Sequence, residues 1–164
     1  MQLDVSNSKN ELLFEARFLP NELAVFQEIY NQSNVSRKQL KELYKRLDTY
    51  EVYTVKVSKS GEKDILIALS EDKADYQNKQ FYLIESIQTD FALVRDGDTL
   101  SPINCQFENN YGAAPFVTLH LTFEKATTKK INSRTLLYND QLFGSGLIAF
   151  DYSFIKNLQI PKIK

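Results

Sequence analysis

The chain has 164 residues, 43% of them apolar and 12% aromatic, and a formal net charge of −1. This length and composition predict one domain with a single packed core and exclude an intrinsically disordered protein. The near-zero charge excludes the strong overall positive field of nucleic-acid-binding proteins. The single cysteine excludes an internal disulfide, and no apolar run approaches the length of a membrane-spanning helix.

Two helices are predicted at the front of the chain, over residues 20–48. Pro20 begins the first, and apolar residues follow it at helical spacing. Ser36 and Gln39 have the spacing of a capping box, in which each side chain satisfies a free backbone amide of the other residue. The second helix is therefore predicted over residues 37–48, with one apolar stripe and with charged side chains facing water.

At Tyr50 the apolar residues change from helical spacing to alternation, so residues 50–164 are predicted to be β-rich. One hairpin is expected from strands over 50–57 and 64–69, joined by a turn on Gly61. A second is expected around Asp96-Gly97, and Pro102 interrupts its return strand. The other predicted strands are FVTLHLTF (116–123), RTLLY (134–138) and GLIAFDYSF (146–154); residues 71–88 fit either a short helix or a loop and a strand.

About seven strands joined by short turns predict antiparallel pairing, because parallel strands need long crossovers. The predicted fold is α+β and mainly β. It is an antiparallel sandwich or curled sheet with the two N-terminal helices packed on it, in one domain of residues 1–164.

Two side chains with catalytic potential are predicted to be structural. Alternation places His120, the chain's one histidine, between threonines on the more polar face of its strand, and no second histidine is present to complete a metal site. Cys105 alternates with Ile103 and Phe107, which predicts a buried and unreactive thiol. No catalytic residue is predicted.

Two charged clusters are also predicted to be structural. Asp96 and Asp98 flank Gly97 in a way that a calcium site could use, but an Asp-Gly-Asp segment between strands is typical of a turn, and the full spacing of a calcium loop is absent. The basic cluster between Lys125 and Arg134 is predicted to be a solvated loop. Nucleotide, phosphate and acyl-transfer motifs are absent, so neither a metal nor a cofactor is predicted.

The loop ahead of strand 116–123 is predicted to be a structured corner. Gly112 supplies a backbone conformation closed to other residues, and Pro115 fixes φ just before the strand. Ordered loops on rigid sheets often carry function, so this loop is also where binding is predicted. The predicted binding residues are Glu108, Asn109, Asn110, Tyr111 and Pro115.

The C-terminal half carries a strand with an Asp-Thr-Leu turn (98–100), the corner segment CQFENNYGAAP (105–115) and YNDQLFGSG (138–146) before a final strand. In this pattern residues 90–164 resemble uncharacterised lipoproteins of Bacteroidetes. The resemblance implies secretion, and an anchor on a cysteine that precedes residue 1. It thus implies the periplasm or outer membrane, while a cytoplasmic location stays open. The Asp-Thr-Leu turn also resembles an O-glycosylation acceptor of that phylum.

Together these observations predict a non-enzymatic binding or structural module of the cell envelope, which interacts with a protein or a glycan. Such a module should expose an apolar or aromatic patch. Two alternatives stay open. One is an inhibitor or immunity-type protein that blocks a partner enzyme. The other is a carboxylate-dependent glycan hydrolase, which needs two carboxylates roughly 5 to 10 Å apart across a groove.

Overall fold

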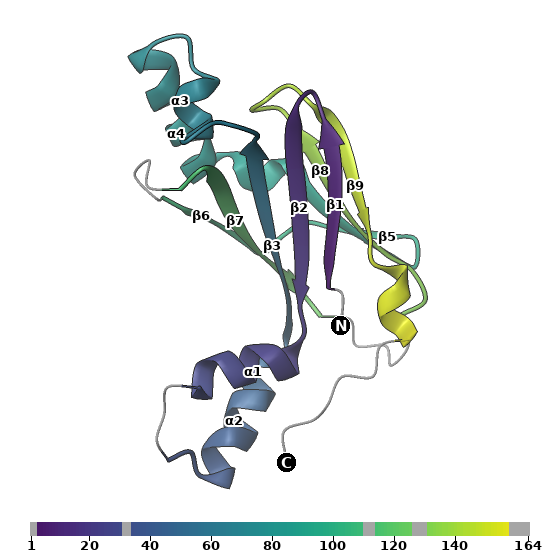
Figure 1. The fold of residues 1–164 in the computed structure, drawn as a ribbon. Coiled ribbons are helices and arrows are strands. Elements are labelled where there is room, and N and C mark those ends of the chain that lie inside the picture. Colours follow the sequence, from purple (N-terminus) through teal and green to yellow (C-terminus); the bar gives the residue numbers. More distant parts are fainter. Residues whose placement is uncertain (1–2, 31–33, 110–113, 126–130, 158–164) are drawn as a thin grey trace.

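Nine strands form two antiparallel sheets in the computed structural model, which describes residues 3–30, 34–109, 114–125 and 131–157 (Figure 1). One sheet has the order β1-β2-β3-β7-β6 and the other β5-β4-β8-β9. The predicted class, α+β and mainly antiparallel strands, is confirmed. The strands are β1 (Asp4–Lys9), β2 (Leu12–Leu19), β3 (Tyr50–Lys59), β4 (Phe91–Arg95), β5 (Asp98–Leu100), β6 (Asn104–Glu108), β7 (Phe116–Glu124), β8 (Arg134–Asp140) and β9 (Gly146–Asp151).

The helices gather at the two opposite ends of the sheets (Figure 1). At one end lie α1 (Asn21–Ile29) and α2 (Arg37–Leu47), and at the other α3 (Ile65–Ala68) and α4 (Lys73–Glu85). Two short 3-10 helices, η1 (Ile87–Asp90) and η2 (Ser153–Asn157), complete the described elements. None of the helices in the described part of the chain is both long and apolar enough to cross a membrane.

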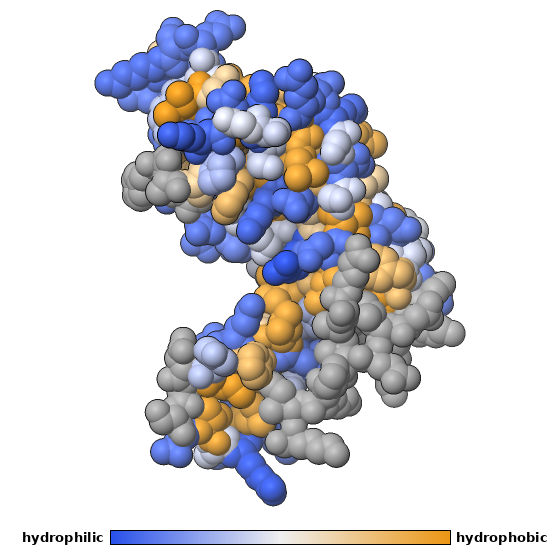
Figure 2. Space-filling view, viewed as in Figure 1, coloured by the Kyte–Doolittle hydropathy of each residue, from blue (hydrophilic) through white to orange (hydrophobic). Residues whose placement is uncertain are grey.

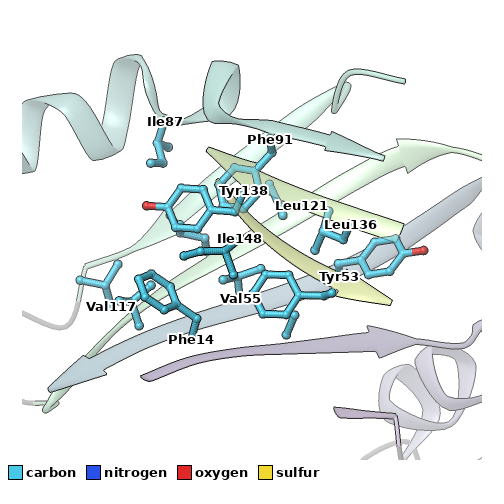
Figure 3. Packing of buried hydrophobic residues seen from close by; sticks show 14 of the residues in the cluster. Phe14, Tyr53, Val55, Ile87, Phe91, Val117, Leu121, Leu136, Tyr138 and Ile148 are labelled. Atoms are coloured by element: carbon cyan, nitrogen blue, oxygen red, sulfur yellow. The ribbon is translucent and has the colours of Figure 1, made fainter. Parts of the chain in front are cut away.

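The core lies between the two sheets and is rich in aromatic side chains (Figure 3). Phe91 on β4 stacks on Tyr138 of β8 with ring centroids 4.4 Å apart, and Phe14 from β2 meets Tyr138 edge-on at 6.0 Å. The Phe91–Tyr138 stack lies within the four-stranded sheet, whereas the Phe14–Tyr138 pair joins the two sheets, because alternate residues of each strand point inward. Alternation along β7 is confirmed: its four inward-pointing side chains, Val117, Leu119, Leu121 and Phe123, are buried.

The N-terminal hairpin β1–β2 was not predicted, although its second strand carries a clear signal. In LLFEARFL every second side chain is buried, as expected for a strand with one face on the core. The turn between the strands uses Asn10 and Glu11, both with positive φ (51° and 65°). Neither residue is glycine, so the turn has no strong signature in the sequence.

The predicted strand over 64–69 is wrong, because this segment forms the short helix α3. The Asp64 carboxylate accepts hydrogen bonds from the backbone N–H groups of Leu66 (2.8 Å) and Ile67 (3.1 Å), so it caps the helix. Gly61 does supply a positive φ of 80°, but its turn leads into α3 and not into a return strand. The ambiguous segment 71–88 is mainly the helix α4.

The hairpin on Asp96-Gly97 is confirmed, and it joins β4 to β5. The strand predicted after this turn is divided in two at Pro102. The first part, β5, belongs to the four-stranded sheet, and the second part, β6, belongs to the five-stranded sheet. The Asp96 carboxylate accepts backbone hydrogen bonds from Asn132 (2.9 Å) and Ser133 (2.7 Å). It therefore organises the chain ahead of β8. Among the described residues no group of three or more potential ligands is placed to hold a metal ion.

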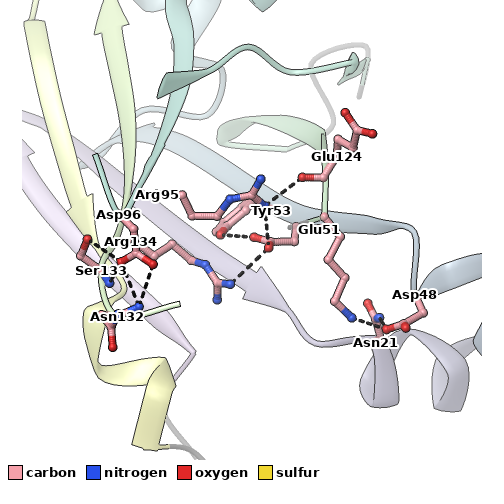
Figure 4. A network of polar contacts seen from close by, with 11 residues as sticks. Asn21, Asp48, Glu51, Tyr53, Arg95, Asp96, Glu124, Asn132, Ser133 and Arg134 are labelled. Atoms are coloured by element: carbon pink, nitrogen blue, oxygen red, sulfur yellow. Dashed lines mark hydrogen bonds and ion pairs between the residues drawn. The ribbon is translucent and has the colours of Figure 1, made fainter. Parts of the chain in front are cut away.

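A buried ionic network ties the two sheets together (Figure 4). Glu51 on β3 accepts hydrogen bonds from Arg95 on β4 (2.9 Å) and Arg134 on β8 (3.2 Å). The Tyr53 hydroxyl donates to the same carboxylate at 3.2 Å. All three charged side chains are buried. The predicted assignment of Arg134 to a solvated loop is therefore wrong, and Lys125 forms an ion pair with Asp48.

Candidate functional site

The described members of the predicted binding loop lie beside the start of β7, where Glu108 and Asn109 line a small cavity. Glu108 ends β6 and Pro115 precedes β7, and both side chains are exposed. Asn109 is half-buried beside a cavity of about 20 Å³, a volume that suits a single water molecule. Asn110 and Tyr111 lie outside the described residues, as does Gly112.

His120 lies on the outer face of the five-stranded sheet, between Thr54 and Glu108. Its Nδ1 is 3.3 Å from the Thr54 hydroxyl, and its Nε2 is 3.3 Å from the Glu108 carboxylate. A hydroxyl, an imidazole and a carboxylate are thus in line, as in acyl-transfer enzymes. However, β3 and β7 pair with each other along this stretch, and their amides are used by the sheet and are not free to form an oxyanion hole. This favours a structural role for His120.

Cys105 packs against the core from β6 and is half-buried. Burial, followed by the nearby charge of Asp90, raises the pKa of its thiol to about 12. A thiol with this pKa is almost entirely protonated at neutral pH, as predicted for an unreactive residue. The expectation that Ile103 shares this buried face is wrong, since its side chain is 53% exposed.

We therefore expect native Cys105 to react slowly with iodoacetamide at pH 8. A pKa near 12 in place of 9.0 lowers the thiolate fraction about a thousandfold, and the higher nucleophilicity of a more basic thiolate recovers only part of this, so the rate should fall by at least about 30-fold. Mass spectrometry of the alkylated protein, with and without 6 M guanidinium, measures the ratio. Equal rates in both conditions would contradict the burial of this thiol.

The fold also brings together two buried carboxylates, Asp90 at the end of η1 and Asp140 at the end of β8. The Tyr82 hydroxyl donates to Asp90 at 2.7 Å, and the Tyr138 hydroxyl donates to Asp140 at 3.0 Å. Burial raises the pKa of Asp90, and the charge of Asp140 raises it further. Because both carboxylates are buried and bonded within the protein, this pair does not face a substrate across a groove, as the hydrolase alternative requires.

Replacing Asp90 with asparagine should change how stability depends on pH. Because its pKa is raised in the folded state, wild-type Asp90 favours folding when protonated, and that contribution is lost as pH rises above the usual aspartate value of 3.8. The introduced amide keeps an oxygen for the Tyr82 hydroxyl but carries no charge. Urea unfolding should therefore show Asp90→Asn gaining stability relative to wild type between pH 4 and pH 7; a constant difference would contradict the shifted pKa.

The hairpin of α1 and α2 is a long insertion between two strands that need no long connection. β2 and β3 are antiparallel neighbours, with Leu19 paired to Val52, and a turn of two to five residues is enough to join such strands. Residues 20–49 are inserted there, and the helices project beyond the sheets (Figure 1). The two helices contact each other, whereas α2 has no buried residue. The pair therefore extends from one end of the sandwich and does not cover a sheet face.

The base of this hairpin is fixed to the strands. Asp48, directly after α2, accepts a hydrogen bond from the Asn21 side chain (2.8 Å) and forms the ion pair with Lys125 after β7. Thr49 accepts a backbone hydrogen bond from Lys125 at 3.0 Å. The predicted capping box at the start of α2 is confirmed. The hairpin is thus held in a defined position on the body.

The hairpin exposes apolar surface on α1 and has a groove between its helices. Phe26 and Tyr30 are 48% and 72% exposed, and their rings lie 5.6 Å apart. Figure 2 shows apolar side chains gathered on this projecting part of the molecule. The groove has a volume of about 430 Å³ and is lined by Glu28, Ile29, Val35, Gln39, Glu42, Leu43 and Arg46. It is large enough to receive side chains of a partner.

This surface was not among the predicted site residues, although the sequence carries a signal for it. Each helix has an apolar stripe, but two isolated helices can bury only the sides that face each other. Val25 of α1 is buried, whereas Phe26, the next residue, points to solvent. The apolar surface of α1 is therefore wider than α2 can cover, and this excess indicates that another protein surface covers the rest.

No protein-family model matches the chain, and neither curated protein sequences nor solved structures give a match. The lipoprotein resemblance of residues 90–164 stays a prediction. The geometry of the described residues alone therefore supports the candidate site.

Proposed function

We propose that the chain is a non-enzymatic binding module and that the α1–α2 hairpin is the element that contacts a partner protein. One observation carries this proposal: the hairpin is inserted between two adjacent strands and exposes the aromatic pair Phe26 and Tyr30. Exposing large apolar side chains to water is unfavourable. A projecting element that exposes them is typical of an interaction site.

The composition of the hairpin favours a protein as the partner. Aromatic residues and arginine are enriched in protein–protein interfaces, and the hairpin carries Phe26, Tyr30 and the groove residue Arg46. The groove combines apolar side chains with an ion pair between Arg46 and Glu28 (3.2 Å). This combination suits an apolar anchor of a partner surrounded by polar contacts. The cell envelope, inferred from the resemblance of residues 90–164, is the proposed compartment, and fractionation of the native host would test it.

Site-specific photo-crosslinking in the native host tests the contact element. A photoreactive phenylalanine analogue in place of Tyr30 should give an adduct of defined mass. The same analogue in place of Gln106, which is exposed on β6, provides the control and should give none. Absence of any adduct at position 30, or equal adducts at both positions, would contradict the proposed role of the hairpin.

A further inference from the structure

Helix α2 of the hairpin concentrates positive charge on a chain that is otherwise negative. Helix α2 contains five basic residues and one acidic residue, a net charge of +4. The whole chain has a net charge of −1, so the remaining residues carry −5. Within the described residues, the exposed side chains of Arg37, Lys38, Lys41 and Lys45 form no ion pair.

The opposite end of the molecule has complementary properties. Residues 62–85, which include α3 and α4, contain six acidic residues and three lysines, a net charge of −3. Three large apolar side chains of this end are exposed: Ile67 by 63%, Phe81 by 67% and Ile84 by 59%. Phe81 and Ile84 are three residues apart on α4, so they lie on one side of the helix. This end therefore combines a net negative charge with exposed apolar side chains.

We infer that the partner of the hairpin is a second copy of this chain, and that the α1–α2 hairpin of one copy docks on the α3–α4 end of the next. This inference depends on the proposed function, because it uses the same hairpin. The cations of α2 would meet the acidic residues around α4. Such a pairing of positive with negative surface is the arrangement found in electrostatically complementary interfaces. The exposed aromatic pair and the apolar part of the groove would cover Phe81 and Ile84.

This arrangement joins two different surfaces, so it is heterologous. The two surfaces lie at opposite ends of the molecule (Figure 1). A head-to-tail contact of this kind leaves one free hairpin and one free α3–α4 end after each addition, and it continues into open chains unless the rotation closes a ring. The expected product is therefore a series of oligomers and not a single dimer.

A second copy fits the charges better than a polyanion does. DNA and anionic membranes present uniform negative charge over areas larger than α2, whose 11 residues span about 16 Å. The net charge of −5 on the remaining residues would be repelled by such surfaces. A second copy instead offers a local acidic surface that also has exposed apolar side chains.

Sedimentation equilibrium of the purified protein tests the inference. The weight-average mass should rise above the monomer value of 19.0 kDa as concentration increases, and less so in 0.5 M salt. Lys38→Glu/Lys45→Glu on α2, or Phe81→Ser on α4, should each weaken association by at least about tenfold. Lys56→Glu, an exposed change in the middle of β3, serves as the control and should associate as the wild type does.

Mixing the two defective variants gives the sharpest result. Each variant keeps one intact surface, so the intact hairpin of Phe81→Ser can dock on the intact α4 of the lysine variant, and growth must stop there. The mixture should therefore contain a one-to-one dimer and no larger species. A wild-type protein that stays monomeric to about 1 mM in low salt, or a mixture that forms no dimer, would overturn the inference.

The outcomes separate this inference from the proposed function. A monomeric protein that still crosslinks at position 30 to a different protein rejects self-association and keeps the hairpin as a contact element. A polyanion is the other possible partner, tested with duplex DNA and with vesicles that contain 30% phosphatidylserine. If the protein does not self-associate but binds either of them, and if the lysine variant loses this binding, the second copy is also overturned as partner. No adduct at position 30 together with a monomeric protein would reject both.

Discussion

Replacing Glu51 with alanine is expected to lower the free energy of unfolding by about 3 to 5 kcal/mol. The Glu51 side chain is 2% exposed and accepts hydrogen bonds from two buried guanidinium groups, those of Arg95 and Arg134. Removing this carboxylate leaves two buried positive charges without a counter-charge. The Nε of Arg134 already has no hydrogen-bond partner, so the network has no spare acceptor.

Urea unfolding followed by circular dichroism measures this effect, and the melting temperature should fall by about 10 °C. Glu15→Ala on β2 is the matched control, because the Glu15 side chain is exposed, and its effect should stay below about 0.5 kcal/mol. A triple variant that replaces Glu51, Arg95 and Arg134 with apolar residues of similar size should recover much of the loss. An effect of Glu51→Ala as small as that of Glu15→Ala would show that the network does not stabilise the sandwich.

Replacing Asp140 with alanine is expected to cost about 2 to 4 kcal/mol. The Asp140 carboxylate is buried and accepts from the Tyr138 hydroxyl (3.0 Å) and from the backbone N–H groups of Phe143 (2.9 Å) and Ser145 (2.8 Å). Alanine leaves all three donors without this acceptor. Relief of repulsion with Asp90 offsets part of the loss.

A matched control is available on the next strand. Asp151 ends β9 and accepts from Ser153, but it is exposed, so water replaces its bonds and Asp151→Ala should cost under about 1 kcal/mol. Hydrogen exchange should show the amides of Phe143 and Ser145 losing protection in Asp140→Ala. If Asp140→Ala and Asp151→Ala lower the free energy of unfolding equally, burial does not make the Asp140 hydrogen bonds more stabilising than exposed ones, which contradicts the prediction.

Much of the β sandwich could be predicted because alternation and turn residues are local signals. β7 was predicted from its own residues, and the turn on Asp96-Gly97 needs a positive φ that this pair adopts readily. The segment 64–69 was assigned to the wrong class, because a short run of apolar residues fits a buried strand and a buried helical turn equally well. The Asp64 cap decides between them.

The candidate site was harder to predict, because its position depends on contacts between distant segments. The capping box and the apolar stripe of α2 were read correctly, but a stripe does not say whether a sheet or another helix covers it. That Phe26 and Tyr30 are exposed follows from the projection of the hairpin beyond the sheets. Likewise, no local pattern indicates that Glu51, Arg95 and Arg134 meet, since they lie on three strands of two sheets.

The position of Glu51 has a mechanical consequence. It lies three residues after Asp48, the residue directly after α2, and it is the second residue of β3. A force that pulls on the projecting helices therefore enters β3 and reaches the two arginines of the opposite sheet almost at once. Both sheets would bear this force together. The hairpin that we propose as the contact element is therefore attached next to the ionic network that holds the two sheets together.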